Sequence, residues 1–129
     1  MSRNTKVPTI VAALATVVVA AAATFAALPG RANAATPKLV ATVGPGYTIT
    51  LRTASGAPAS TVKAGVYAIT VRDRSDEHNF HLTGAGVNKA TSIDWVGTKT
   101  WRVRVVRGKT YRFVCDPHAG MMRGSFRGR

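Results

Sequence analysis

The residue types best suited to hold a soft metal ion gather in one short segment near the C-terminus. Cys115, the single cysteine of the 129-residue chain, is followed closely by His118, Met121 and Met122. A thiolate, an imidazole and a thioether on one short loop can converge on a single ion, and this donor set favours copper over hard cations. Zinc accepts the same Cys and His ligands, but its structural sites use four strong ligands and a thioether is a poor fourth. The segment therefore predicts a copper site.

A further ligand has to come from another part of the chain, and His78 is the candidate. Alternate residues of a strand face the same side, so His78 shares a face with Phe80 and Leu82, while Asn79 and His81 lie on the other face. The apolar face is the core side, so we expect His78 to point inward and His81 to face solvent. Two histidines and one cysteine with a weak axial methionine form the blue-copper arrangement.

The remainder of the chain from Ala35 onward has the pattern of a β protein. Short β-branched and aromatic runs alternate with clusters of Gly, Pro, Asn and Asp, and no stretch keeps a helical period for more than a turn or two. About seven to eight short strands predict an all-β, Greek-key sandwich of two sheets. We expect strands over residues 38–43, 47–52, 66–73, 78–83, 98–106, 110–115 and 124–128.

The last predicted hairpin sorts apolar and basic residues onto opposite faces. Tyr111 and Cys115 share the apolar face, which predicts that the cysteine points into the core at the end of a strand. Arg102, Arg104 and Arg112 lie on the other face. We expect these three to form a basic stripe on the solvent side of one hairpin.

Both ligand segments resemble those of a known family. HNFHL at 78–82 and YRFVCDPHAGMMRGSF at 111–126 are similar to the ligand regions of the plastocyanin- and azurin-like cupredoxins. The resemblance is strongest over residues 66–128, and Cys-x2-His-x3-Met followed by x-Gly is its most specific element. It implies that one copper ion is held by four residues: His78, Cys115, His118 and Met122.

The family pattern also bears on residues beside the ligands. Its methionine precedes x-Gly and then a core strand, as Met122 does, so Met122 is preferred to Met121 as the axial ligand. Shorter ligand loops occur in the family, so Met121 remains the alternative. An asparagine directly follows the family's ligand histidine, and Asn79 matches it. The resemblance implies that Asn79 links the two ligand segments through hydrogen bonds.

Asp116 departs from the Ser or Thr that follows the cysteine in plastocyanins. A carboxylate beside the thiolate favours oxidised copper, so replacing it with a neutral amide stabilises Cu(I). We therefore expect Asp116→Asn to raise the reduction potential.

The N-terminal segment has the layout of a secretory signal. Arg3 and Lys6 precede an uncharged run over residues 7–28, and the small-x-small triplet of residues 32–34 follows. We expect residues 1–34 to be a signal peptide cleaved after Ala34, and residues 35–129 to be the copper-binding domain. The alternative is a retained anchor, because an uncharged run of this length can span a bilayer. Both place the domain outside the cytoplasm: extracellular, periplasmic or on the outer face of the cell envelope.

The predicted domain is strongly basic. The whole chain has a net charge of +13, and without Arg3, Lys6 and Arg31 fifteen basic residues remain against five acidic ones, a net charge of +10. Such a field favours acidic protein surfaces, anionic lipid headgroups or cell-wall polymer. We do not expect nucleic acid as a partner, because the chain has no recognition motif and no basic-aromatic repeat.

The resemblance implies that the protein transfers single electrons between redox partner proteins, with the exposed edge of His118 as the electron port. We expect a monomer whose partner has an acidic docking surface. We expect no enzymatic activity, because four protein ligands leave no open position for a substrate. A copper storage, scavenging or delivery protein is the alternative, although such proteins tend to have more Met, Cys or His ligands than one site needs. A metal-free interaction module is disfavoured by the clustering of the ligand types.

Overall fold

The computed structural model describes residues 34–129. The expected signal peptide or anchor, residues 1–34, thus lies outside the described residues except for Ala34. Within the described range, no helix is long and apolar enough to cross a membrane.

Nine strands and one short 3-10 helix make up the described chain. In chain order they are β1 (Lys38–Val43), β2 (Ile49–Thr53), β3 (Thr61–Val62), β4 (Gly65–Asp73), β5 (His81–Gly84), β6 (Val87–Ala90), β7 (Gly97–Val105), β8 (Thr110–Val114), η1 (Asp116–His118) and β9 (Arg123–Gly128).

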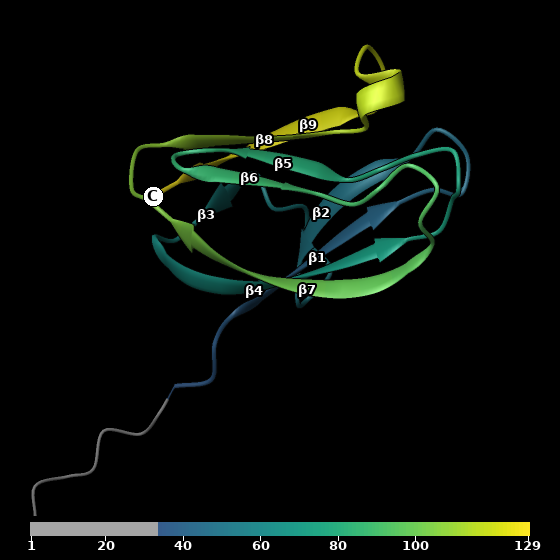
Figure 1. Ribbon diagram of the computed structural model, residues 1–129. Helices are drawn as coiled ribbons and strands as arrows, with labels where there is room; N and C mark the ends of the chain where they lie inside the picture. Colours follow the sequence, from purple (N-terminus) through teal and green to yellow (C-terminus); the bar gives the residue numbers. More distant parts are fainter. Residues whose placement is uncertain (1–33) are drawn as a thin grey trace, which may run out of the picture. The chain divides into compact units, whose positions relative to one another are not determined.

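The strands form two sheets that face each other (Figure 1). One sheet has the order β2-β1-β4-β7 and the other β3-β9-β8-β5-β6, and the chain crosses repeatedly from one to the other. β1 pairs in parallel with β4, and β3 pairs in parallel with β9, while the other pairs are antiparallel. The expected all-β sandwich is confirmed.

The core lies between the sheets and is filled by alternate residues of the strands. The rings of Tyr111 and Phe126 stack there with centroids 4.9 Å apart. A buried tyrosine hydroxyl needs partners, and that of Tyr111 accepts from Val106 N at 2.9 Å and donates to Arg104 O at 3.1 Å. The buried core residues of the described chain fall between Leu39 and Phe126.

Two of the expected strand starts were wrong. β5 begins at His81 rather than at residue 78, so His78 lies in the loop that carries the chain from β4 to β5. β2 begins at Ile49 rather than at residue 47, which leaves Tyr47 in a turn. The two strands that sequence analysis missed, β3 and β6, are a two-residue strand and a mostly exposed four-residue strand, and both lie at a sheet edge. Neither has the alternation of apolar and polar residues by which a half-buried strand is recognised.

The expected basic stripe on one hairpin was also wrong. β7 and β8 follow each other in the chain but belong to different sheets. Arg102 and Arg104 are exposed on the outer face of one sheet, and Arg112 is exposed on the other. The alternation along each strand was correct, whereas the pairing of the two strands was not.

Candidate metal centre

One end of the sandwich, here named the site end, gathers the predicted ligands. β4 ends at this end, and β7 begins there, because Asp73 pairs with Gly97. The loop from β4 to β5 carries His78, and the end of β8 leads into Cys115 and η1, the short coil at the edge of the sandwich in Figure 1. Segments 37 residues apart in the sequence are thus brought side by side.

Three predicted donor atoms converge. His78 Nδ1 and His118 Nδ1 are 3.0 Å apart, and Cys115 Sγ lies 3.6 Å from each of them. His78 and Cys115 are buried, and His118 is partly exposed. The structure therefore has a cluster of two imidazole nitrogens and one sulfur with one edge open to solvent.

These separations fit a single bound ion. Imidazole nitrogen and thiolate sulfur lie about 2.0 to 2.3 Å from a metal, so two such donors on one ion stand roughly 3 to 4 Å apart. The two Nδ1 atoms are too close for both to carry a hydrogen between them, so at least one of them presents a lone pair. A cation among them satisfies all three, and the mixture of sulfur and imidazole nitrogen suits copper.

The two adjacent methionines point in opposite directions. Met122 is fully buried, whereas Met121 is 67% exposed. The ligand loop closes on itself, because Cys115 N donates to Met122 O at 2.9 Å and Met122 N donates to His118 O at 2.9 Å. These bonds hold the backbone of Met122 beside Cys115 and His118, and its side chain is buried.

Proline shapes the turn between two of the ligands. Pro117 lies in the first turn of η1, where its fixed φ is compatible with a helix and its missing N–H leaves no bond unmade. His118 N then donates to Cys115 O at 3.0 Å. This turn sets the spacing between the thiolate and the imidazole.

Asn79 joins the two ligand segments, as the resemblance implied. Its Nδ2 donates to Asp116 Oδ2 at 2.7 Å, and its Oδ1 accepts from Asp116 N at 2.7 Å. Its own backbone N–H points at Cys115 Sγ, 3.5 Å away. The residue after one ligand is thereby bonded to the residue after another, which fixes His78 relative to Cys115.

A buried hydrogen-bond chain holds the other side of the His78 loop. The hydroxyl of Thr91 donates to Asp73 Oδ2 at 2.7 Å and accepts from Phe80 N at 2.8 Å. Burial raises the pKa of Asp73, against hydrogen bonds from Thr91 and from Ser75 N that lower it. The end of β4, the His78 loop and the segment after β6 are thus tied together.

His81, which was expected to face solvent, has two hydrogen-bond partners. Its Nδ1 lies 2.9 Å from Asp116 Oδ1, and its Nε2 lies 2.7 Å from Asn88 Oδ1. The bond to Asp116, with that to Asn88, raises the pKa of His81. Partial burial alone would raise the pKa of Asp116, but its bonds with Asn79 and His81 outweigh burial and lower that pKa.

Tyr47 is the residue at the site that sequence analysis missed. Its ring contacts both ligand imidazoles, with centroids 5.0 Å from that of His118 and 5.5 Å from that of His78. The ring is 66% exposed, so it covers the histidines on the solvent side. The available signal was the Gly-Pro-Gly sequence of residues 44–46, which predicts a turn directly before Tyr47, whereas Tyr47 was assigned to a strand.

That turn is held tightly against the His78 loop. Gly44 N donates to Thr48 O at 2.9 Å, and Thr48 Oγ1 donates to Pro45 O at 3.0 Å. Gly44 has a φ of +68°, and a Cβ there would lie 2.9 Å from Ser75 Cβ. Only glycine suits both the backbone conformation and the close approach.

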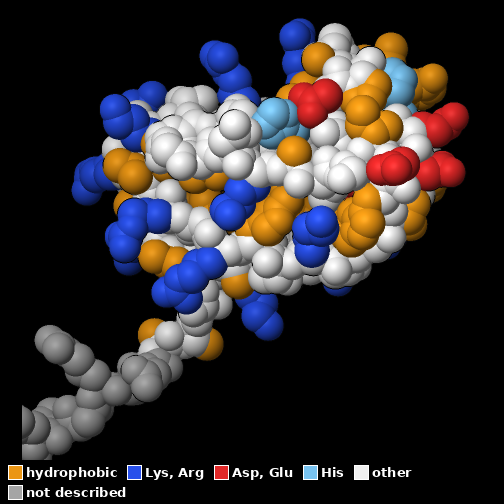
Figure 2. All heavy atoms as spheres, viewed as in Figure 1, with side chains coloured by type: hydrophobic (Ala, Val, Ile, Leu, Met, Phe, Trp, Pro, Cys, Tyr) orange, Lys and Arg blue, Asp and Glu red, His pale blue; other side chains and the backbone are white. Residues whose placement is uncertain are grey.

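The acidic side chains of the described residues gather at the site end, as Figure 2 shows for the visible face. Each lies at the end of β4, in the loop before β5, in the segment between β6 and β7, or in η1: Asp73, Asp76, Glu77, Asp94 and Asp116. Arg123, next to Met122, is an exposed basic residue at the same end but at the start of β9.

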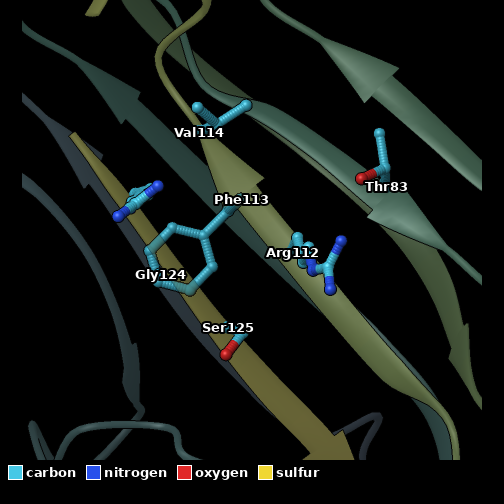
Figure 3. Close-up of a pocket in the computed structure, with 7 residues that line it drawn as sticks. Thr83, Arg112, Phe113, Val114, Gly124 and Ser125 are labelled. Atoms are coloured by element: carbon cyan, nitrogen blue, oxygen red, sulfur yellow. The ribbon is translucent and has the colours of Figure 1, made fainter. Parts of the chain in front are cut away.

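The glycine of the family pattern lies under an aromatic ring. A Cβ at Gly124 would clash with the ring of Phe113, which lies across β9 in Figure 3. Beside it, a depression of about 650 Å³ is lined by Thr83, Arg112, Arg123 and Ser125 among others. This depression includes none of the predicted ligands.

Comparison with known proteins supports these observations. A family model described as copper binding proteins of the plastocyanin/azurin family matches residues 57–127. A crystal structure of the copper protein rusticyanin is 18% identical, covers 71% of this chain and 76% of its own, and has a TM-score of 0.53. Rusticyanin from Thiobacillus ferrooxidans is 20% identical with the same coverage and a TM-score of 0.52. At this identity the two structures support the fold alone.

A search among curated protein sequences gave no match. The family model nevertheless covers more than half of the chain and includes the segments of all four predicted ligands. The donor cluster lies in those segments. The chain therefore belongs to the plastocyanin/azurin family of copper-binding proteins, and its cluster of His78, Cys115 and His118 serves one copper ion.

Proposed function

We propose that this protein is an exported type 1 blue copper protein that carries single electrons between redox partner proteins. The observation that carries the proposal is the convergence of Cys115 Sγ with the Nδ1 atoms of His78 and His118 at 3.0 to 3.6 Å. Met122 is the proposed fourth ligand, because it is buried beside the cluster and Met121 is exposed. The copper ion supplies the one-electron step by alternating between Cu(I) and Cu(II).

The hydrogen bonds around the ligands support electron transfer in particular. A fast one-electron step requires ligands that stay in place when the charge changes. Asn79 and Asp116 hold the two ligand segments to each other, and Thr91 holds Phe80 to Asp73. The proposed site resists rearrangement because both sides of the His78 loop are tied down.

His118 is the proposed electron port. It is the one partly exposed donor of the proposed site. The exposed ring of Tyr47 contacts it, and the exposed Met121 follows it by three residues in the chain. A partner that docks over this surface approaches the copper through one imidazole. The net charge of +10 attracts a partner with an acidic surface at long range. The acidic residues gather at the docking end itself, so Arg123 is the local basic contact that such a partner would use.

The remaining parts of the proposal rest on sequence. Export follows from the signal-like segment of residues 1–34. We propose a monomer that works on the outer side of the membrane and catalyses no reaction of its own, since four protein ligands leave no position for a substrate.

Optical and electron-paramagnetic-resonance titration of residues 35–129 with Cu(II) tests the site, with Cys115→Ser as the control. An intense visible thiolate-to-copper band with narrow hyperfine splitting, lost in Cys115→Ser, is expected. A pale, widely split signal that survives in Cys115→Ser would refute a blue site. Electron self-exchange of the loaded protein, measured by NMR line broadening, then separates transfer from storage. Slow exchange together with ready loss of copper to a chelator would favour storage or delivery.

A further inference from the structure

The end of the sandwich opposite the metal centre is strongly basic. The turn between β3 and β4 and the turn between β7 and β8 meet there at the last residue of the described chain. Ala64 N donates to Arg129 O at 2.8 Å, and Gly108 N donates to Gly128 O at 2.8 Å. Five exposed basic residues belong to these turns and to the end of β9, and they are named the basic pole: Lys63, Arg107, Lys109, Arg127 and Arg129.

No acidic residue of the described chain lies near the basic pole, because all five belong to the site end. β4 connects the two ends over nine residues, which at about 3.3 Å per residue separates them by roughly 26 Å. The Debye length at physiological salt is about 8 Å. The carboxylates at the site end therefore do little to weaken the field at the basic pole.

Basic side chains continue from the pole along the outer face of one sheet. Arg104 pairs with Val66, one residue after the start of β4, and Arg102 pairs with Ala68, whose other neighbour is Lys38. All three basic side chains are exposed. The exposed basic residues thus form an extended surface rather than a single isolated charge.

The chain also approaches the domain from this end. β1 runs parallel to β4, and Ala68 N donates to Pro37 O at 3.0 Å, so the residues before Lys38 lie toward the start of β4. In sequence, the uncharged run of residues 7–28 precedes this point. The charges favour an anionic surface at this end, and in the retained-anchor alternative the chain direction also favours a bilayer over a wall polymer.

We infer that the basic pole binds the anionic headgroups of a lipid bilayer and holds the metal centre away from it. A surface made of several Lys and Arg gains attraction from each one that approaches anionic lipid. Because the two ends of the sandwich are roughly 26 Å apart, Tyr47 and His118 then lie at the end that faces away from the bilayer. This inference does not depend on copper or on electron transfer, and it can be tested with the metal-free domain.

The test compares two variants of residues 35–129 with equal net charge. The pole variant combines Lys63→Glu, Arg107→Glu and Lys109→Glu. The control combines Arg72→Glu, Lys89→Glu and Arg112→Glu, which are exposed residues outside the pole. Each changes the net charge from +10 to +4. Binding to phosphatidylglycerol vesicles is measured by co-sedimentation at about 0.1 M salt, with phosphatidylcholine vesicles for comparison.

We expect the pole variant to lose about a hundredfold in apparent affinity for anionic vesicles, since each basic residue near the surface contributes roughly a factor of five. The control variant should lose much less. Equal losses in both variants would mean that vesicle binding depends on net charge and not on where the charges lie, and would overturn the inference. Binding to polyglutamate without binding to phosphatidylglycerol vesicles would overturn it as well.

A second measurement uses the unmodified domain and so does not depend on how the variants fold. Bicelles that contain phosphatidylglycerol and a gadolinium-chelating lipid broaden the NMR signals of amides near the headgroups. Broadening at Ala64 and Gly108, with Gly120 unaffected, is the expected pattern. Broadening at Gly120 instead would place the site end against the lipid and overturn the inference.

Discussion

Asn79 and Asp116 exchange two hydrogen bonds of 2.7 Å, one between side chains and one from the backbone N–H of Asp116. Each residue directly follows a ligand, His78 in one case and Cys115 in the other. The pair therefore ties together the two segments that have to meet around one ion. Most of the predictions below concern this link and the side chains around it.

Replacing Asn79 by Ala should destabilise the metal-free domain by about 1 to 3 kcal/mol. The change removes both bonds to Asp116 and leaves its backbone N–H without an acceptor. Urea unfolding followed by circular dichroism measures the effect. Ser92→Ala, at an exposed position on the loop after β6, is the control and should change stability by less than about 0.5 kcal/mol. A loss in Asn79→Ala no larger than in the control would show that the link contributes nothing.

Asp116→Asn should raise the reduction potential of the copper-loaded protein, because it removes a negative charge beside the thiolate while an amide can still bond to Asn79. Cyclic voltammetry measures the potential. Asp94→Asn removes an exposed carboxylate at the same end, and it should shift the potential less. An unchanged or lower potential in Asp116→Asn would contradict the assigned role of the carboxylate.

The His81–Asp116 pair should make stability depend on pH within a defined window. The pKa of His81 is raised above 6.5, so its contribution is fully present below pH 6.5 and is lost as the pH rises through the raised value. The pKa of Asp116 is lowered below 3.8, so its contribution is present above pH 3.8 and is lost as the pH falls through the lowered value. The pair thus stabilises most between these two pH values.

The measurement is the difference in unfolding free energy between the metal-free domain and its His81→Gln variant across pH. The difference should be largest between pH 3.8 and 6.5 and should shrink on the alkaline side. It will be modest, because both side chains are partly exposed. A difference that does not change with pH would mean that the contribution of this contact to stability does not depend on the charges of His81 and Asp116.

Gly124→Ala should destabilise the domain by about 1 to 3 kcal/mol through overpacking. A methyl group there meets the ring of Phe113, which is itself buried. Gly120→Ala is the matched control, since a Cβ at Gly120 has no atom within 4 Å and its φ is not positive. Thermal unfolding of both variants distinguishes a packing constraint from a general loss at glycine. Equal stability of the two would refute the packing argument.

Tyr47→Ala should open the copper site to small anions, because the ring covers both ligand imidazoles on the solvent side. Azide titration of the Cu(II) protein, followed optically and by electron paramagnetic resonance, measures this access. Tyr47→Phe keeps the ring and should behave like the unchanged protein. Azide binding to Tyr47→Phe as readily as to Tyr47→Ala would assign the effect to the hydroxyl instead.

The sequence by itself determined the donor types, the sandwich and the inward direction of Cys115. These features are local: a strand alternates its faces with a period of two, and Cys115, His118 and Met122 are close because the chain between them is short. The alternation also placed Leu82 in the core, but it failed just before β5, where Asn79 was expected on the other face and is buried between His78 and Phe80. A family resemblance then implied the Asn79 link, which no periodicity reveals.

Tertiary structure decided what depends on contacts between distant segments. Tyr47 covers the site only because the turn after β1 packs against the His78 loop, and His81 finds Asp116 only because β5 pairs with β8. β7 and β8 have clear alternation, yet they separate into different sheets, which divides the expected stripe of arginines. Likewise, net charge follows from composition, whereas the separation of acidic residues from the basic pole depends on which loops the strand directions bring to the same end. Local periodicity is encoded in a few consecutive residues, but pairing and charge placement depend on which segments meet in space.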